Sequence, residues 1–193
     1  MRLNILNQGY KFGTKMLFLI IKFLSGYPLP DAAKIIFYRP NFYGNPAKKF
    51  TQQAMRGPSV WTVGDRELMA AYVSKQNECT FCIKAHSAVS AGAYRNREQV
   101  DRALADICKA DLSPALRAML IMLGKLTREH EINADDISRV LETGVSAEQI
   151  EDALAVCFAF NVTNRLADAF GFHVPSERAF EAGAKYLLKH GYA

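Results

Sequence analysis

Residues 65–86 carry the pattern that decides the fold, and they read DRELMAAYVSKQNECTFCIKAH. Apolar side chains recur at intervals of three and four residues along this stretch, which is the spacing of an α-helix and not of a strand. Asp65 is placed to cap a helix that runs to about Lys75, and a second helix runs from about residue 77 to about Tyr94. The stretch therefore predicts two consecutive helices joined by a short turn.

Helix signals of the same kind continue through the rest of the chain. Ser113-Pro114 places a capping residue before a proline at the first helical position, residues 146–149 (SAEQ) fit a capping box, and Gly171 can end that helix. The expected helices lie at about 3–24, 97–108, 114–129, 134–143, 147–169 and 176–190. Residues 25–64 are expected to form a connecting arm with short helical pieces, and only residues 59–63 (SVWTV) resemble a strand. The fold class is therefore predicted to be all-α.

Length and composition predict one domain over residues 1–193. Half of the residues are apolar and 22% are charged, which excludes a disordered or low-complexity protein. Four cysteines are too few for a small domain held together by disulfides, so the pair at Cys79 and Cys82 indicates redox or metal chemistry instead. Within the domain we expect a basic N-terminal helix and arm at 1–58 and a helical core with the cysteine pair at 59–193.

The charge is divided unevenly between these two parts. Residues 1–58 hold nine Lys or Arg and one acidic residue, a net +8, whereas residues 59–193 hold fifteen and eighteen, a net −3, which together give the +5 of the chain. A basic arm on a mildly acidic body indicates that the arm docks on its own body or on a neighbouring subunit. No nucleic-acid partner is expected, because no basic run exceeds Lys48-Lys49 and no recognition motif accompanies it.

An apolar run near the start, residues 16–21 (MLFLII), imitates the core of a signal peptide. Lys22 interrupts it, no small-x-small cleavage site follows, and a helix that spans a bilayer needs roughly 20 apolar residues. An amphipathic helix that packs on protein or touches a membrane surface fits better. We expect a cytoplasmic protein without membrane contact.

The chemistry is predicted from Cys79, Cys82 and His86. At about 100° per residue, the three side chains share one face of a helix, and cysteines three positions apart lie close enough for a disulfide. A helix that begins just before them places both thiols where unpaired N–H groups favour a thiolate. His86, one turn after Cys82, is placed to take up a thiol proton. This arrangement favours a thiol redox centre.

Two other readings of the cysteine pair stay open. Cys79, Cys82 and His86 could be three ligands of a zinc ion, but a fourth ligand from Cys108, Cys157, His130, His173 or a carboxylate would be required, and none forms a second ligand pair. Alternatively, both cysteines could be buried thiols that only fill space.

The stretch from Asp65 to Ser74, followed by Asn77, Cys79, Cys82 and His86, resembles the signature of the alkylhydroperoxidase D/carboxymuconolactone decarboxylase superfamily, most closely its peroxidase-related branch. Residues 37–44 (FYRPNFYG) and 160–171 (FNVTNRLADAFG) agree with the same branch, so the resemblance covers roughly residues 35–175. It implies an all-helical protein with an antiparallel helical core that assembles as a trimer, a hexamer or a similar ring.

The resemblance also implies the roles of four residues. Cys82 would be the peroxidatic cysteine, Cys79 the resolving cysteine, and His86 with Glu67 the proton relay. Glu67 alone would read as a solvated residue in the first turn of a helix, but as part of the motif it is expected in a largely apolar pocket with a raised pKa. One position departs from the pattern, since the well-studied peroxidases of the family have a second His where this chain has Phe81, which puts a high peroxidase rate in doubt.

The leading hypothesis is therefore a thiol-dependent hydroperoxidase that requires no cofactor and no metal. Its partners would be a hydroperoxide substrate and a dithiol or thioredoxin-like electron donor. A second hypothesis is a lyase of the carboxymuconolactone decarboxylase type, in which Glu67 and His86 perform acid–base chemistry. A third is a non-enzymatic assembly protein whose cysteine pair senses redox state or binds a metal.

Overall fold

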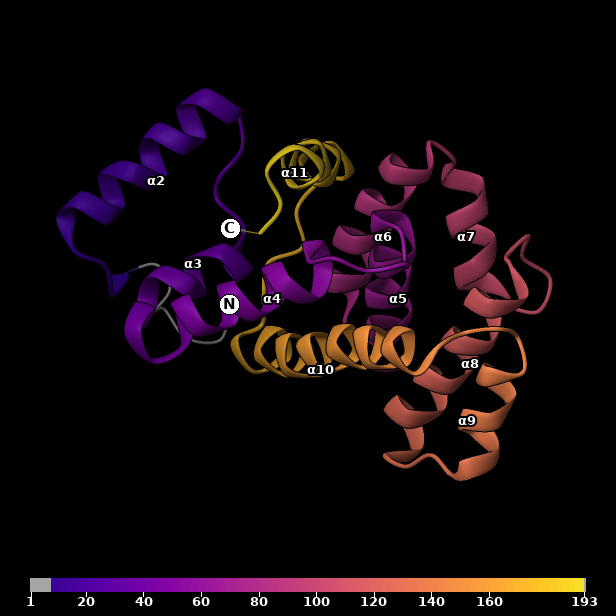
Figure 1. The fold of residues 1–193 in the computed structure, drawn as a ribbon. Helices are drawn as coiled ribbons and strands as arrows, with labels where there is room; N and C mark the ends of the chain where they lie inside the picture. The colour runs from indigo at the N-terminus through magenta and orange to yellow at the C-terminus, as the bar shows by residue number, and fades with distance from the viewer. Residues whose placement is uncertain (1–7, 193) are drawn as a thin grey trace.

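The computed structural model describes residues 8–192, and these form helices without a strand (Figure 1). The elements are α2 (Phe12–Ser25), α3 (Asp31–Tyr38), the short π-helix η1 (Pro40–Gly44), α4 (Asn45–Arg56), α5 (Val63–Gln76), α6 (Thr80–Tyr94), α7 (Arg97–Ala105), α8 (Pro114–Glu129), α9 (Ala134–Leu141), α10 (Ala147–Phe170) and α11 (Glu177–His190). The predicted all-α class is confirmed.

The core is organised around α5 and α6. These consecutive helices have the most extensive contact in the molecule, and the short connection between them makes them antiparallel (Figure 1). Leu68, Met69 and Val73 of α5 are fully buried, because α8 and α10 also pack against this helix. The other side of α6 is covered by α11. The expected antiparallel helical core is therefore present.

Several helices begin or end at the capping residues that the sequence predicts. Ser113 and Ser146 cap α8 and α10, each accepting a hydrogen bond from the backbone three residues on, and Gly171 ends α10 in the left-handed conformation with φ +60°. The helices α7 and α9 end two to three residues earlier than expected, at Ala105 and Leu141.

The start of α5 differs from the prediction. Thr62 is the N-cap, and Asp65 is the third helical residue, which closes a capping box by accepting from the Thr62 backbone N–H at 2.9 Å. This geometry explains why the segment 59–63 is not a strand: its last two residues cap and begin the helix. Its Trp61 is buried and donates from Nε1 to the Gln149 carbonyl at 2.8 Å.

The start of α6 also differs, because the chain turns after α5 before the next helix begins. Asn77 is the C-cap of α5, and Glu78 has a left-handed backbone with φ +57°. Cys79 is consequently the N-cap of α6, and Cys82 is its third residue. The prediction of a helix start at residue 77 or 78 was early by two or three residues, since α6 begins at Thr80.

The N-terminal arm is more helical than predicted, since α4 alone spans 12 residues and packs along α10. The single helix expected over 3–24 is confirmed for residues 12–24, which lie in α2, and is wrong at residues 9–11, where the chain bends before α2 begins; residues 1–7 lie outside the described residues. Across the described chain, no helix has the length and apolar character needed to cross a membrane.

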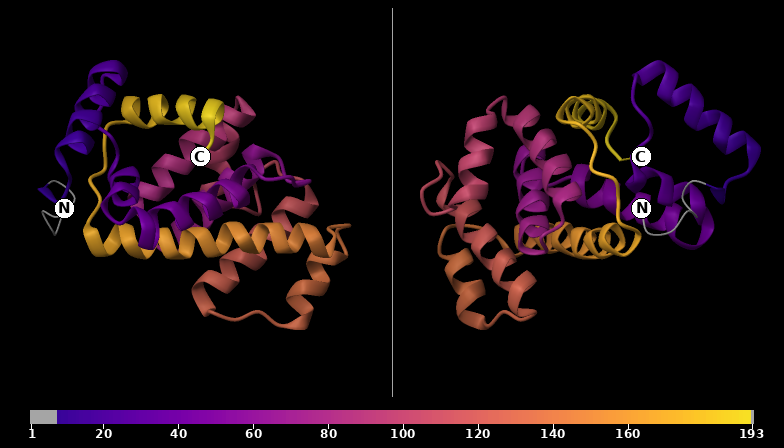
Figure 2. Two further views of the ribbon diagram at one scale, coloured as in Figure 1. Left: turned by 60° about the vertical axis from the view of Figure 1, so that its left-hand side comes forward. Right: turned by 180° about the vertical axis from the view of Figure 1, so that it is seen from behind.

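The cysteine pair lies in a separate, smaller hydrophobic cluster between α6, α11, the end of α10 and α3. Figure 2 shows how α11 lies over α6 and how the chain after α10 crosses to reach it. The buried members of this cluster are Ile35, Cys79, Phe81, Cys82, Ala88, Val89, Ala167, Phe172, Phe180 and Ala184. Part of the arm, Ile35 of α3, therefore helps to cover the thiols.

Candidate active site

The two motif cysteines lie together at the N-terminus of α6 and are not joined by a disulfide. Both are buried, with 2% of Cys79 and 1% of Cys82 exposed, so the thiols are closed off from solvent. Each thiol lies close enough to the other to shift its pKa. The spacing of three positions at the start of α6 is the one that a disulfide between them needs.

The surroundings of the two thiols shift their pKa values in opposite directions. The interaction with the Cys82 side chain outweighs burial, and with the N–H groups of Cys82 and Phe81 at the helix N-terminus it lowers the pKa of Cys79. No regular N-cap hydrogen bond forms there, so the N–H groups act mainly through their dipoles. For Cys82, the interaction with the Cys79 side chain, burial, and the charge of Cys79 raise the pKa well above its usual value. The surroundings therefore favour the thiolate form of Cys79 over that of Cys82.

Glu67 and His86 form a second pair, one turn along α6 from Cys82. Glu67 is fully buried on α5, His86 is 6% exposed, and Nδ1 of the imidazole lies 2.7 Å from Oε2 of the carboxylate. The antiparallel packing of α5 and α6 brings the two residues together from positions 19 apart in the sequence. The ring of His86 is also held at its edge by Phe160, with 4.2 Å between the ring centroids.

Arg56 and Tyr192 complete this pair, and sequence reasoning did not identify either of them as a site residue. Arg56, the last residue of α4, donates from Nη2 to Glu67 Oε1 at 2.7 Å, and the Tyr192 hydroxyl donates to the same oxygen at 2.9 Å. The Arg56 guanidinium also lies over the Tyr192 ring, 5.0 Å from its centroid. The Tyr192 backbone N–H donates to Gln52 Oε1, which fixes the end of the chain against α4.

The expected raised pKa of Glu67 is wrong. Burial alone would raise it, but the hydrogen bond from His86, the charge that this imidazole carries when it is protonated, and the charge and hydrogen bond of Arg56 outweigh burial and lower the pKa of Glu67. The pocket is not largely apolar, because two segments distant in sequence bring a guanidinium and a phenol into it. Burial and the Glu67 charge raise the pKa of Tyr192 well above its ordinary value, so the phenol keeps its proton and donates it.

An ionised Glu67 determines which nitrogen of His86 carries the proton. A carboxylate only accepts hydrogen bonds, so the proton of the neutral imidazole lies on Nδ1, between the ring and Glu67 Oε2. The other ring nitrogen, Nε2, is then an acceptor. The arrangement provides an oriented base on the same helix face as the cysteine pair.

The structure brings the four predicted site residues into two adjacent groups rather than one hydrogen-bonded chain. In the reduced state, and among residues 8–192, no hydrogen bond joins the His86 ring to either sulfur. Phe81, which replaces the second His of the family pattern, packs against the rings of Phe172 and Phe180. Over the same described residues, no three His, Cys, Asp or Glu side chains are grouped so that they could hold a metal ion.

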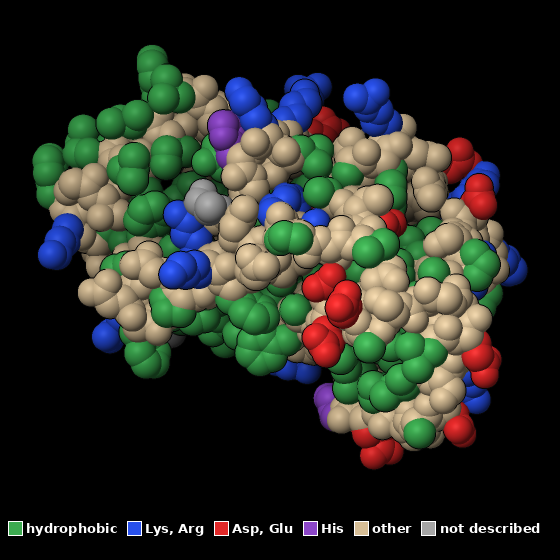
Figure 3. Space-filling model, in the orientation of Figure 1, with side chains coloured by type: hydrophobic (Ala, Val, Ile, Leu, Met, Phe, Trp, Pro, Cys, Tyr) green, Lys and Arg blue, Asp and Glu red, His purple; other side chains and the backbone are tan. Residues whose placement is uncertain are grey.

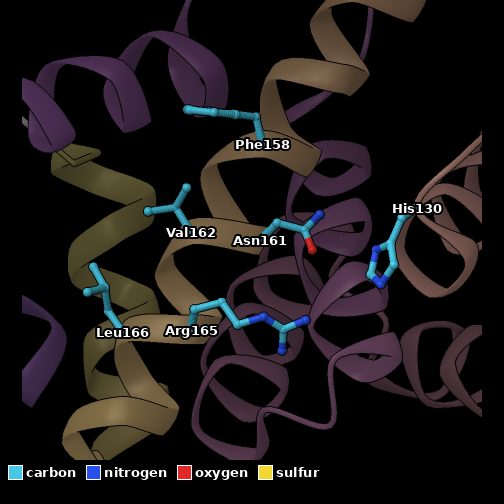
Figure 4. A pocket seen from close by; sticks show the side chains of 6 residues that line it. All are labelled: His130, Phe158, Asn161, Val162, Arg165 and Leu166. Carbon is cyan, nitrogen blue, oxygen red and sulfur yellow. The ribbon is translucent and has the colours of Figure 1, made fainter.

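A surface pocket along α10 lies outside this site. Figure 4 shows its lining residues, which are His130, Phe158, Asn161, Val162, Arg165 and Leu166. Two of its polar side chains hold the turn before the cysteine motif, since Asn161 accepts from Asn77 Nδ2 at 2.9 Å and Arg165 donates to Asn77 Oδ1 at 3.2 Å. These two side chains of α10 therefore hold the turn that precedes Cys79. Neither motif cysteine is among the residues that line the pocket.

The fold that carries this site is all-helical and of the alkylhydroperoxidase D-like type. The structure is similar to an uncharacterized peroxidase-related protein from Silicibacter sp. TM1040, with a TM-score of 0.78, 25% sequence identity, and 91% of this chain and 92% of that chain covered. It is also similar to an alkylhydroperoxidase AhpD core protein, an uncharacterized peroxidase-related protein from Ralstonia eutropha JMP134, with a TM-score of 0.73, 24% identity, and the same two coverages. No protein-family model and no curated protein matches the sequence. The chain has the AhpD-like fold, which confirms the resemblance noted in its sequence.

Proposed function

We propose that this chain is a dithiol–disulfide oxidoreductase that consumes hydroperoxides through Cys79 and Cys82. The observation that carries the proposal is the pair itself: two buried, free thiols at one helix N-terminus that shift each other's pKa in opposite directions. Two thiols that only fill space would not need to interact in this way. An oriented imidazole on the same face of α6 supplies the base that such chemistry uses.

The reaction proceeds through a sulfenic acid. In this scheme the Cys82 proton moves to the neighbouring Cys79, which leaves the thiolate on Cys82, one turn from His86. The Cys82 thiolate attacks the terminal oxygen of the hydroperoxide, the O–O bond breaks, and the alkoxide leaves and is protonated to an alcohol. The Cys79 thiol then condenses with the sulfenic acid, releasing water and forming the disulfide. An external dithiol reduces the disulfide to two thiols and is itself oxidised to a disulfide.

Glu67 and His86 deliver the proton that the leaving oxygen needs. Glu67 holds the imidazole with its proton on Nδ1, so Nε2 is free to accept a proton from solvent and pass it to the alkoxide. Arg56 and Tyr192 keep Glu67 ionised and in place. Because the thiols are closed off, a substrate reaches them only after the covering side chains of α3 or α11 move.

The test is peroxide consumption by the full chain with dithiothreitol as reductant. Activity is expected to fall to the background rate in Cys82→Ser and in Cys79→Ser, and to be retained in Cys108→Ser, whose thiol is exposed and distant from the motif in sequence. Mass spectrometry after one addition of peroxide is expected to show a Cys79–Cys82 disulfide. Full activity in Cys82→Ser would overturn the mechanism.

The buried Glu67–His86 pair also favours a second candidate, the acid–base lyase, because its geometry does not depend on sulfur. This activity would survive alkylation of both thiols, whereas the dithiol activity would be lost. The thioredoxin-like donor and the trimeric or hexameric assembly expected from the family resemblance remain predictions.

A further inference from the structure

The helix α2 presents a large apolar surface that the rest of the chain does not cover. Figure 1 shows that it projects from the helical body, and Figure 3 shows hydrophobic side chains gathered over the same region. None of its residues is buried. The exposed fractions of Phe23, Phe12 and Leu24 are 88%, 79% and 78%, which are large even for surface side chains.

The exposed apolar side chains form one stripe. At about 100° per residue, Leu19, Phe12, Phe23, Met16, Ile20, Leu24 and Leu17 follow one another around the helix within an arc of about 160°. The half-buried residues Thr14, Phe18 and Ile21 fall outside this arc. Phe18 makes edge-to-face contacts with Tyr10 and Phe37, at 5.0 and 5.4 Å between centroids. The side of α2 that carries Phe18 therefore packs against the rest of the protein, and the apolar stripe faces outward.

The charges on and near α2 are all positive. Lys15 and Lys22 lie about 40–60° beyond one edge of the stripe, and Lys11 is the N-cap. The first acidic residue of the chain is Asp31, which is buried and paired with Lys34 at 2.8 Å. The apolar face of α2 is bordered by lysines, and the described part of the arm has no exposed carboxylate beside it. Such a face complements a surface with an apolar interior and an anionic exterior.

We propose that α2 docks this protein on a bilayer surface that carries anionic headgroups. The stripe lies among the upper acyl chains, and Lys15 and Lys22 lie at the level of the headgroups. A pairing of two α2 helices, stripe against stripe, fits less well, because it would bring the lysines of both copies together without an acidic residue on either helix. The sequence alone had led us to expect no membrane contact; the exposure of the whole stripe is what reverses that expectation.

The test is co-sedimentation of the full chain with two kinds of vesicle, phosphatidylcholine alone and an equal mixture of phosphatidylcholine and phosphatidylglycerol. The chain is expected to bind the mixed vesicles about ten-fold or more tightly than the neutral ones, with binding that weakens as salt is added. The double variant Phe12→Ser/Phe23→Ser is expected to lower binding by about ten-fold or more, because both side chains would leave the acyl region. Phe158→Ser is the matched control, since Phe158 is a 61% exposed aromatic residue on α10.

Three results would overturn the proposal. The first is that the native chain fails to bind the mixed vesicles. The second is that Phe158→Ser weakens binding as much as the double variant does. The third is that the native chain does not bind vesicles but forms an oligomer, and that the double variant dissociates this oligomer. That result would show that the stripe contacts a second copy of the chain. Circular dichroism of each variant checks that the fold is kept, as expected for exposed side chains.

Discussion

Nδ1 of His86 on α6 lies 2.7 Å from Oε2 of Glu67 on α5, and both side chains are buried at the centre of the helix pair. A buried carboxylate is stable only when it is paired, and here Arg56 and the Tyr192 hydroxyl supply the further partners. The contact therefore depends on α4, which precedes the helix pair, and on Tyr192, which follows α11. It also fixes the orientation of the imidazole on α6.

We expect Glu67→Gln to reduce peroxide turnover by about 100-fold, within the range that proton-transfer groups contribute. The glutamine amide is neutral, so it no longer requires the His86 proton to lie on Nδ1, and the base at Nε2 is no longer fixed. The measurement is the initial rate with dithiothreitol and a hydroperoxide. Glu98→Gln is the matched control, because Glu98 is an exposed residue that pairs with Arg102 on α7. Rates of Glu67→Gln within two-fold of the native rate would contradict the role given to Glu67.

We expect Tyr192→Phe to lower the free energy of unfolding by about 2 kcal/mol, the range for a hydrogen bond to a charged group. The substitution keeps the ring against Arg56 and removes only the hydroxyl that donates to Glu67. Urea unfolding measures the change. Tyr186→Phe serves as the control, since Tyr186 on α11 is 59% exposed. An equal loss in both variants would show that the Tyr192 hydroxyl has no special role.

The parts of the fold that were predictable from the sequence are those set by local chemistry. Ser113, Ser146 and Gly171 end their helices because a side-chain oxygen or a left-handed glycine satisfies the nearest backbone groups. The start of α5 was harder, because Thr62 and Asp65 are both capping residues and occupy the two ends of one capping box. Sequence alone does not say which of the two lies outside the helix.

The predictable part of the site is likewise the local part. Cys79, Cys82 and His86 are related by helical spacing, so their common face followed from the sequence. Arg56 and Tyr192 reach Glu67 across 11 and 125 positions, and no local pattern marks them. Their absence from the prediction explains why the pKa of Glu67 was expected to be raised. A buried Glu beside a basic arm was the one signal that a cation partner was needed.

We expect the stability of the protein to fall in acid partly through Glu67. The pKa of Glu67 is lower in the folded state than its ordinary value of 4.5, so its ionisation stabilises the fold above that value. This contribution is lost as the pH falls from about 5 through the folded pKa. The free energy of unfolding of the native chain should therefore decrease more between pH 7 and pH 3 than that of Glu67→Gln. Parallel pH profiles for the two proteins would contradict this expectation.

We expect iodoacetamide to modify Cys79 before Cys82 in the reduced protein. The exposed fractions of Cys79 and Cys82 are 2% and 1%, and Cys82 is the more deeply placed thiol, so both the thiolate population and access favour Cys79. The pKa of Cys79 is lowered, so its rate should level off at a pH below the ordinary thiol value of 9.0, while Cys82, with a raised pKa, stays slow. In Cys79→Ser the interaction with a charged sulfur is gone, and the pKa of Cys82 should fall toward its usual value.

This labelling experiment is best performed in a Cys108→Ser background, because Cys108 is exposed and would consume reagent first. Trypsin leaves Cys79 and Cys82 in one peptide, residues 76–84, so fragment ions that separate the two cysteines locate the label. Modification of Cys82 first would place the resting charge on that sulfur and remove the need for proton transfer within the pair. Modification of Cys79 first would place the resting charge on Cys79, so attack by Cys82 would require a proton to move between the two sulfurs first.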